Sequence, residues 1–222
     1  MSKEGTIKFY ENVGWKRLEE STDFRVKHYL KNVHEYLLDN IRGNALVLEV
    51  GCGTGSFVKE IANQVKEVIG VDVSEKLIKK AKKGLEGVEN IKLIAADIED
   101  AKIPKNFFDF VISIWTLPNI DNSISFIKKM KSVLKPGGSV FVDTYSEEAT
   151  PIRIKMYEKY GLTILGHDKK NIFIKEGLTE KVYTEEGLRK LFESAGMNVE
   201  IIKIHKLGYL CKAIKPLKKK NA

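Results

Sequence analysis

Short apolar runs alternate with amphipathic segments through most of this chain. Runs that suit strands buried on both faces of a sheet lie at 45–50, 67–71, 91–95, 107–114 and 139–144. Segments with apolar residues at helical spacing precede or separate them, at 23–41, 56–64, 74–84 and 122–134. Because strands that alternate with helices form βαβ units, the pattern predicts a parallel sheet with right-handed crossovers and helices on both faces.

The last third of the chain departs from this alternation. Residues 146–183 are longer than a plain crossover needs, with a helix expected near 148–160 and an extended segment at 172–174. A helix from Thr184 to Ala195 and strands at 199–204 and 207–214 follow, and the short link between these two strands implies an antiparallel hairpin. The sequence therefore predicts a doubly wound, seven-stranded, mostly parallel α/β sheet with an antiparallel C-terminal hairpin.

The most informative stretch is VLEVGCGTG at 47–55, where an apolar run reaches Glu49 and then breaks into three alternate glycines. Glycines permit a tight turn with positive φ and leave no Cβ between the backbone and a ligand. The helix at 56–64 would point its free N–H groups and positive dipole end at this turn. Strand, glycine turn and helix together predict a nucleotide-type pocket. Asp72, Asp97 and Trp115 each follow a later strand, and the carboxyl ends of these strands are expected to meet at the same edge of the sheet.

Composition limits the class of protein. A chain of 222 residues with 43% hydrophobic and 31% charged residues is typical of one folded domain. Its apolar runs all fall short of the roughly 20 residues of a membrane span, and the polar start lacks a signal-peptide core. Two cysteines, Cys52 and Cys211, cannot make a disulfide framework, and no His, Cys, Asp and Glu cluster has metal-ligand spacing. We therefore expect a cytoplasmic protein without a structural metal.

The net charge of +8 raises the alternative of a nucleic-acid partner. Lysine far outnumbers arginine, however, and arginine is the residue that makes bidentate phosphate contacts. The lysines of 79–83 lie opposite the apolar stripe of a helix and are interpreted as a solvated face. The basic tail at 215–220 keeps an RNA partner open as an alternative.

Two details of the glycine stretch separate the possible nucleotides. Dinucleotide folds favour G-x-G-x-x-G/A, whereas here the register is G-x-G-x-G and the sixth position is Ser56. Glu49 would repel a pyrophosphate but would attract an ammonium group. With Asp72 and Asp97-Ile98 downstream, the segment resembles the class I S-adenosylmethionine-dependent methyltransferases, over about residues 40–214.

This resemblance implies which residues hold the cofactor. The glycine turn would wrap its methionine part, Asp72 would take the ribose hydroxyls, and Asp97 with the next N–H would take the adenine. Val73 would flank the adenine, and the chain after the fourth strand would line both cofactor and acceptor. The implied cofactor-binding residues are Glu49, Gly51, Cys52, Gly53, Gly55, Asp72, Val73, Asp97, Ile98, Ile114 and Trp115.

Methyl transfer by in-line displacement needs alignment and desolvation more than acid–base groups, because a sulfonium is already activated. The sequence assigns no catalytic residue; Tyr10, Tyr145 and His167 are candidates for a general base. We expect one domain over residues 1–222, with a helical cap at 1–42 and a lid insertion at 146–183.

The leading hypothesis is a methyltransferase that acts on a small molecule, with no membrane association. An RNA or protein acceptor, a non-catalytic cofactor-binding partner subunit and a nicotinamide oxidoreductase remain alternatives. Neither the acceptor nor the oligomeric state follows from the sequence.

Overall fold

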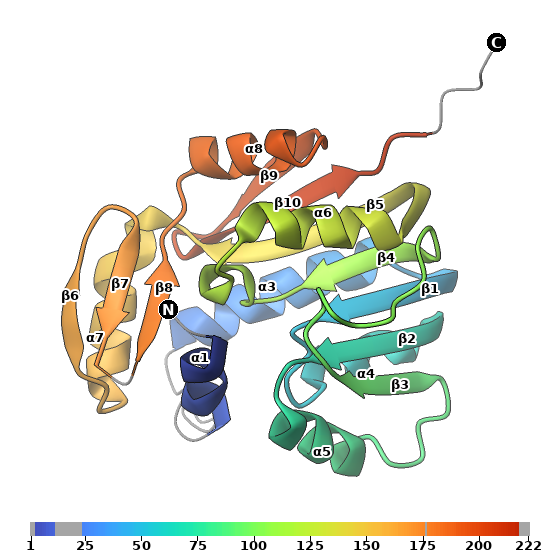
Figure 1. Ribbon diagram of the computed structural model, residues 1–222, viewed down its shortest axis with the longest axis horizontal. Helices are drawn as coiled ribbons and strands as arrows, with labels where there is room; N and C mark the ends of the chain where they lie inside the picture. Colours follow the sequence, from blue (N-terminus) through green and yellow to red (C-terminus); the bar gives the residue numbers. More distant parts are fainter. Residues whose placement is uncertain (1–2, 12–23, 176, 218–222) are drawn as a thin grey trace.

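The computed structural model describes residues 3–11, 24–175 and 177–217 (Figure 1). Parts of the expected cap, at residues 1–2 and 12–23, and the end of the basic tail lie outside these ranges. Among the helices of the described ranges, none combines the length and the apolar content that crossing a bilayer requires.

A seven-stranded sheet forms the centre of the molecule, in the order β3-β2-β1-β4-β5-β10-β9 (Figure 1). The strands are β1 (Gly43–Val50), β2 (Val65–Asp72), β3 (Ile91–Ala95), β4 (Phe108–Ser113), β5 (Leu134–Tyr145), β9 (Val199–Ile204) and β10 (Gly208–Ile214). The first five pair in parallel, and β10 runs antiparallel to both β5 and β9. The predicted sheet and its C-terminal hairpin are therefore confirmed.

Helices cover both faces of this sheet. The helices α3 (Phe24–Asn40), α4 (Ser56–Ala62) and α5 (Glu75–Gly84) pack into one hydrophobic core, and α6 (Ser123–Val133) and α8 (Glu185–Ser194) into the other. Strand β1 supplies both cores, since Val47 points into the first and Leu48 into the second. A strand buried on both faces explains the uninterrupted apolar run at this position.

Polar side chains cap two of the helices at their N-termini. The Ser74 side chain accepts a hydrogen bond from the Leu77 N–H at 3.1 Å at the start of α5, and Thr184 accepts one from the Gly187 N–H at 3.0 Å at the start of α8. The strand expected at 139–144 begins earlier, because β5 starts at Leu134 and includes residues 136–138. Gly137 adopts φ +83 there, and the pairing of β4 with β5 shifts register before Phe110.

Residues 146–183 form a small unit beside the main sheet. It contains η3 (Glu147–Ala149), α7 (Thr150–Lys159) and an antiparallel sheet of β6 (Ile164–His167), β7 (Asn171–Ile174) and β8 (Leu178–Lys181). Periodicity predicts the helix and β7, but not β6 or β8, because four-residue strands give a weak signal. Strand β8 packs against α1 (Lys3–Phe9) and against η2 (Leu117–Asn119) (Figure 1).

A buried ion pair holds this small unit together. Arg153 of α7 is 1% exposed and is bonded to Glu180 of β8, which also accepts a hydrogen bond from the Tyr157 hydroxyl at 2.5 Å. The Arg153 guanidinium lies 4.3 Å from the ring centroid of Tyr145, at the end of β5. The Glu180 carboxylate raises the pKa of Arg153 against the lowering effect of burial, so the guanidinium stays charged in an apolar setting.

A second buried polar cluster links α3 to β5. Asp143 is 0% exposed, and its oxygens accept hydrogen bonds from the Trp115 main-chain N–H at 2.5 Å and from the Tyr29 hydroxyl at 3.0 Å. Burial raises the pKa of Asp143 to about 7, although both hydrogen bonds lower it. The carboxyl group is therefore easier to protonate in the folded protein than in the unfolded chain.

We expect the change Glu180→Ala to lower the free energy of unfolding by about 3–5 kcal/mol, because it leaves a buried guanidinium unpaired. Adding Arg153→Met to the same chain should recover much of this loss. Urea unfolding followed by circular dichroism measures both. The matched control is Glu186→Ala, which removes an exposed pair with Lys190 and should leave the unfolding midpoint unchanged. An equal effect of Glu180→Ala and Glu186→Ala would contradict the prediction.

The raised pKa of Asp143 predicts a pH dependence of stability. Because the folded state holds this proton more tightly, the stabilisation is complete below the unfolded pKa near 3.8 and is lost as the pH rises through about 7. The loss corresponds to about 4 kcal/mol, and Asp143→Asn should remove it from the profile. Urea unfolding of both proteins between pH 4.5 and 8 makes the comparison. If the free energy of unfolding depended on pH in the same way in both proteins, the raised pKa of Asp143 would be refuted.

Candidate functional site

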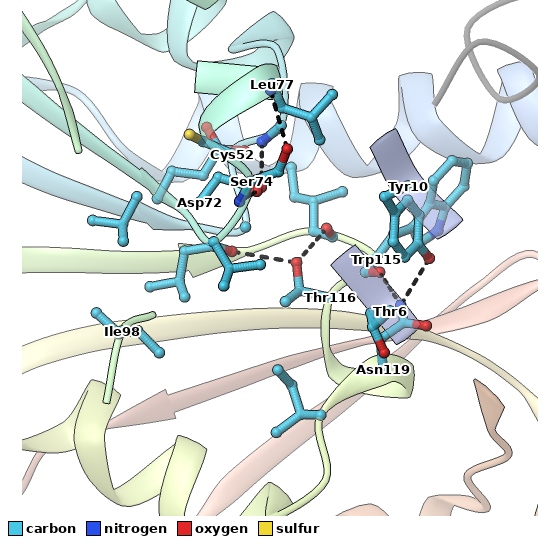
Figure 2. Close-up of a pocket in the computed structure, with 18 of the residues that line it drawn as sticks. Thr6, Tyr10, Cys52, Asp72, Ser74, Leu77, Ile98, Trp115, Thr116 and Asn119 are labelled. Atoms are coloured by element: carbon cyan, nitrogen blue, oxygen red, sulfur yellow. Dashed lines mark hydrogen bonds between the residues drawn. The ribbon is translucent and has the colours of Figure 1, made fainter. Parts of the chain in front are cut away.

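A cavity of about 610 Å³ opens at the carboxyl edge of the main sheet. It lies where the strand order reverses between β1 and β4. Its wall includes the ends of β1 and β2 and the chain that follows β3 and β4. Figure 2 shows Cys52, Asp72 and Ser74 on one side of the cavity and Tyr10, Trp115 and Asn119 on the other. Its volume falls within the range of small-molecule sites.

The glycine turn after β1 packs closely on its neighbours. The N–H groups of Gly51 and Cys52 donate to the Val71 carbonyl at 2.7 and 3.1 Å, which ties the turn to β2. Gly51 has φ +77, and a Cβ there would lie 2.0 Å from Thr116 Oγ1. Only glycine therefore allows the turn to lie against the chain that follows β4.

The third glycine of the motif has a different place. Gly55 adopts φ +78 at the start of α4, and a Cβ there would lie 2.7 Å from a methyl carbon of Leu85. It is not part of the cavity wall within the described residues, whereas Gly51, Cys52 and Gly53 are. The structure therefore gives Gly55 a role in packing α4 against the end of α5.

Glu49 lies in the cavity wall although it is only 3% exposed. Burial raises the pKa of this carboxyl well above its usual range, and the nearby Asp72 and Glu60 raise it further. The Val58 N–H, in the first turn of α4, lowers it. The Oε2 atom is buried without a hydrogen-bond partner among the described residues. A positively charged group of a ligand would satisfy this oxygen.

Asp72 ends β2 beside the glycine turn. Its Oδ2 accepts from the Gly53 N–H and its Oδ1 from the Ser74 N–H, each at 2.9 Å. Burial raises the pKa of Asp72, and these two bonds lower it. The Ser74 hydroxyl in turn donates to Glu11 at 2.8 Å, which connects the end of the N-terminal segment to this strand end. Each carboxylate oxygen keeps a second lone pair for a ligand hydroxyl.

The remaining residues implied by the resemblance also reach the cavity. Val73, Asp97, Ile98 and Ile114 all lie in its wall. Asp97 follows β3, and its Oδ1 accepts a hydrogen bond from the Glu99 N–H at 2.8 Å. Ile98 is buried at 5% exposure, so it presents an apolar surface. The topology therefore brings together residues that lie up to 66 positions apart in the sequence, from Glu49 to Trp115.

Trp115 forms part of the opposite wall. It has φ +53, an uncommon conformation for a residue with a side chain. Asn119, four residues on, donates from Nδ2 to the Tyr10 hydroxyl at 2.9 Å and to the Trp115 carbonyl at 3.4 Å. Because a carbonyl only accepts, the second bond fixes the orientation of the amide. Asn119 Oδ1 and Trp115 Nε1 are buried without partners among the described residues.

The three candidates for a general base lie in different settings. Tyr10 lines the cavity, and burial raises its pKa, so its phenol stays protonated at neutral pH. Tyr145 is buried behind Trp115, with ring centroids 5.4 Å apart, and does not belong to the described cavity wall. His167 is exposed on β6, away from the cavity. Of the three, the structure brings only Tyr10 to the site.

Several wall residues were not singled out by sequence reasoning. Thr6 and Ile7 of α1, Val26 and Leu30 of α3, and Asn119 after β4 all line the cavity. Val26 and Leu30 belong to an apolar helical stripe, which by itself indicates packing against a core. The signal that such residues line a ligand site is the place of their helix at the carboxyl edge, which only the fold gives.

The cavity suits a cofactor with cationic groups. Within the described residues, the wall carries a single lysine or arginine, Lys27. It carries five acidic residues, which are Glu49, Asp72, Asp97, Glu99 and Asp121. The buried, unpartnered Glu49 oxygen and the cradle left by Gly51 add a charge site and room for a close backbone contact. S-adenosylmethionine, which carries a sulfonium and an ammonium but no phosphate, fits this wall better than a pyrophosphate does.

Comparisons with known proteins support the same family. Residues 48–142 match the family model described as a methyltransferase domain. A curated relative, the demethylmenaquinone methyltransferase of Staphylococcus saprophyticus, is 30% identical over 217 residues, which cover 90% of this chain and 91% of that protein.

Solved structures share the fold. A chain of the complex between the Haloferax volcanii Trm112 methyltransferase activator and a methyltransferase superimposes with a TM-score of 0.73 at 16% identity, covering 97% of this chain and 99% of that chain. An S-adenosylmethionine-dependent methyltransferase from Aquifex aeolicus gives a TM-score of 0.63 at 19% identity, covering 97% and 100%. The chain is thus a member of the class I S-adenosylmethionine-dependent methyltransferases, with S-adenosylmethionine as its cofactor.

Proposed function

We propose that this enzyme holds S-adenosylmethionine along the carboxyl edge of β1–β4 and transfers its methyl group to a small, non-anionic molecule. The observation that carries the proposal is the acid-rich cavity that the turn after β1 and the chain after β4 enclose together with α1 and α3. The residues proposed to contact the cofactor are Glu49, Gly51, Cys52, Gly53, Asp72, Val73, Asp97, Ile98, Ile114 and Trp115.

Each end of the cofactor has a separate set of partners in this proposal. Glu49 and the N–H groups of the glycine turn take the ammonium and carboxylate of the methionine part. Asp72 takes the ribose hydroxyls with the lone pairs that Gly53 and Ser74 leave free. Asp97 takes the adenine amine, and Val73 with Ile98 covers the adenine ring.

S-adenosylmethionine supplies an activated methyl group, so the protein's task is to align the acceptor and exclude water. Trp115 and Tyr10 supply an aromatic wall for this purpose. The Tyr10 phenol, protonated at neutral pH, donates a hydrogen bond rather than removing a proton. We also propose that α1 and α3, in the cap region 1–42, close the cavity, and that residues 146–183 support α1 from behind through β8.

The apolar and acidic residues of the cavity wall also favour an uncharged or cationic acceptor. Isoleucine, valine and leucine from α1 and α3 face it, and its charged residues are mostly acidic. A polyanion such as RNA would meet repulsion here. The exposed lysines of α5 lie on that helix's solvent face, and Lys215 of the basic tail is bonded to Asn106 and the Leu134 carbonyl. The name of the staphylococcal relative, demethylmenaquinone methyltransferase, supports an uncharged, ring-containing acceptor.

We further propose that the enzyme works in the cytoplasm. Both cysteines are free and buried, which suits a reducing compartment.

Titration calorimetry with S-adenosylhomocysteine and with 5′-methylthioadenosine, which lacks the amino-acid part, tests the assignment of the cofactor contacts. Glu49→Gln should weaken S-adenosylhomocysteine about 10- to 100-fold, because a charged hydrogen bond contributes about 1.5–3 kcal/mol, and should leave 5′-methylthioadenosine unchanged. Asp72→Asn should weaken both ligands, because both contain the ribose. Glu67→Gln, an acid paired with Lys92 away from the described cavity wall, is the matched control. Equal losses of both ligands in Glu49→Gln would contradict the assignment.

Incubation with methyl-labelled S-adenosylmethionine and cell extract tests the acceptor class. We expect label to enter the fraction that passes a small-pore filter and to survive prior treatment of the extract with nuclease and protease. Label that disappears after nuclease or after protease would instead assign an RNA or a protein acceptor. The variant Asp72→Asn is the control, because label that it incorporates as fully as the parent would not come from the enzyme's cofactor site.

A further inference from the structure

The chain after β4 leaves the strand through an uncommon backbone conformation. Trp115 has φ +53, a region that residues with a Cβ seldom adopt and that costs free energy unless neighbouring groups hold it. The ring of Trp115 and the side chains of Thr116 and Asn119 all line the cavity (Figure 2). The direction of the backbone at Trp115 therefore determines where three wall residues lie.

A buried carboxylate holds this conformation. The Trp115 N–H donates to Asp143 Oδ1 at 2.5 Å, and the Tyr29 hydroxyl donates to Asp143 Oδ2 at 3.0 Å. Both Asp143 and Tyr29 are 0% exposed. The carboxylate thus connects three elements, namely β5, α3 and the chain after β4, and it is not itself part of the described cavity wall.

The aromatic rings around Asp143 reinforce this connection. The Trp115 ring lies nearly parallel to the Tyr29 ring, at 4° and 6.2 Å between centroids, and to the Tyr145 ring, at 18° and 5.4 Å. The Trp115 backbone and its ring are therefore fixed by the same tyrosine, once through Asp143 and once by stacking. Loss of the carboxylate would leave the partly buried Trp115 N–H without this acceptor, which favours a different backbone conformation.

A movement of Trp115 would displace residues of the cavity wall that are bonded to it. Thr116 Oγ1 donates to the Ile114 carbonyl at 3.1 Å, in the position where Gly51 leaves room for it. Asn119 donates to the Trp115 carbonyl and to the Tyr10 hydroxyl. A change of the backbone at Trp115 would displace Thr116 from its place beside Gly51 and disturb the hydrogen bond from Asn119 to Tyr10.

We propose that Asp143 is a positioning residue, which holds the Trp115 backbone in the conformation that shapes the cofactor and acceptor cavity. The effect on ligand binding rests on the proposed function, since it takes the Trp115 wall to contact the cofactor. The effect on the backbone conformation of Trp115 does not depend on the proposed function.

Substitutions of Asp143 differ in the hydrogen bonds that they preserve. An asparagine keeps a carbonyl oxygen for the Trp115 N–H, and its amide can donate to the Tyr29 hydroxyl, which both donates and accepts. A leucine of similar size removes both bonds. Asp143→Asn should therefore preserve the arrangement, and Asp143→Leu should lose it.

The experiment uses the full chain with Trp15→Phe, so that Trp115 is the remaining tryptophan of the two in the sequence. Trp115 fluorescence and the affinity for S-adenosylhomocysteine are measured for the parent, Asp143→Asn, Asp143→Leu and Asp109→Leu. Asp109 is the matched control, because it also accepts from a main-chain N–H, that of Leu46 at 2.9 Å, and from a side chain, Lys135 at 2.8 Å, but lies at the amino end of β4.

We expect Asp143→Leu to shift the emission of Trp115 and to weaken S-adenosylhomocysteine at least tenfold. Asp143→Asn and Asp109→Leu should stay within about twofold of the parent. Parent-like emission and affinity in a folded Asp143→Leu protein would overturn the proposal. Failure of the parent itself to bind S-adenosylhomocysteine would overturn the proposed function, and the emission readout would still test the role of Asp143.

A second measurement covers the case in which Asp143→Leu does not fold. The measurement is made above the raised pKa of Asp143, where this side chain is a carboxylate. In protein labelled with ¹⁵N-tryptophan, the Trp115 amide should show slow hydrogen exchange, and its proton resonance should move upfield in Asp143→Asn, because an amide oxygen is a weaker acceptor than a carboxylate. An unchanged resonance in Asp143→Asn would show that the Trp115 N–H does not bond to Asp143 and would refute the proposal.

Discussion

The close contact between the turn after β1 and the chain after β4 is the constraint on which the site depends. Two parallel strands that lie side by side at a reversal of strand order send their following segments to opposite faces, which leaves a crevice at their carboxyl ends. Here the two segments lie in close contact, because any Cβ at Gly51 would collide with Thr116. The same contact lies between Glu49, two residues before Gly51, and Trp115, one residue before Thr116.

In the proposed function, the charges of the crevice determine which ligand it accepts. A buried carboxylate is unfavourable unless it is protonated or paired, and the raised pKa values of Glu49 and Asp72 express this cost. A cofactor with a sulfonium and an ammonium offsets it. In the proposed function the acidic wall therefore takes part in binding the cofactor, and it distinguishes this site from glycine turns that bind a pyrophosphate.

Buried polar groups connect the site to the parts of the chain that have no recognisable motif. Asp143 joins β5 and α3 to Trp115, and Arg153 with Glu180 joins α7 to β8 behind the same aromatic rings. Strand β8 in turn supports α1, whose following residues Tyr10 and Glu11 reach the cavity and Ser74. The N-terminal segment and residues 146–183 are thus connected to the cavity wall, although neither contains a recognisable motif.

The sequence by itself determined the order of the main strands and helices and the glycine turn with its acids. These features depend on local spacing, which strands of period two, helices of period 3.6 and turns at glycine record directly. Tertiary structure alone decided that Val26 and Leu30 line the cavity, that Gly55 packs on Leu85, and that Asp143 meets residues 28 and 114 positions away. Such contacts join elements that are distant in the chain, so no local pattern of polar and apolar residues carries them.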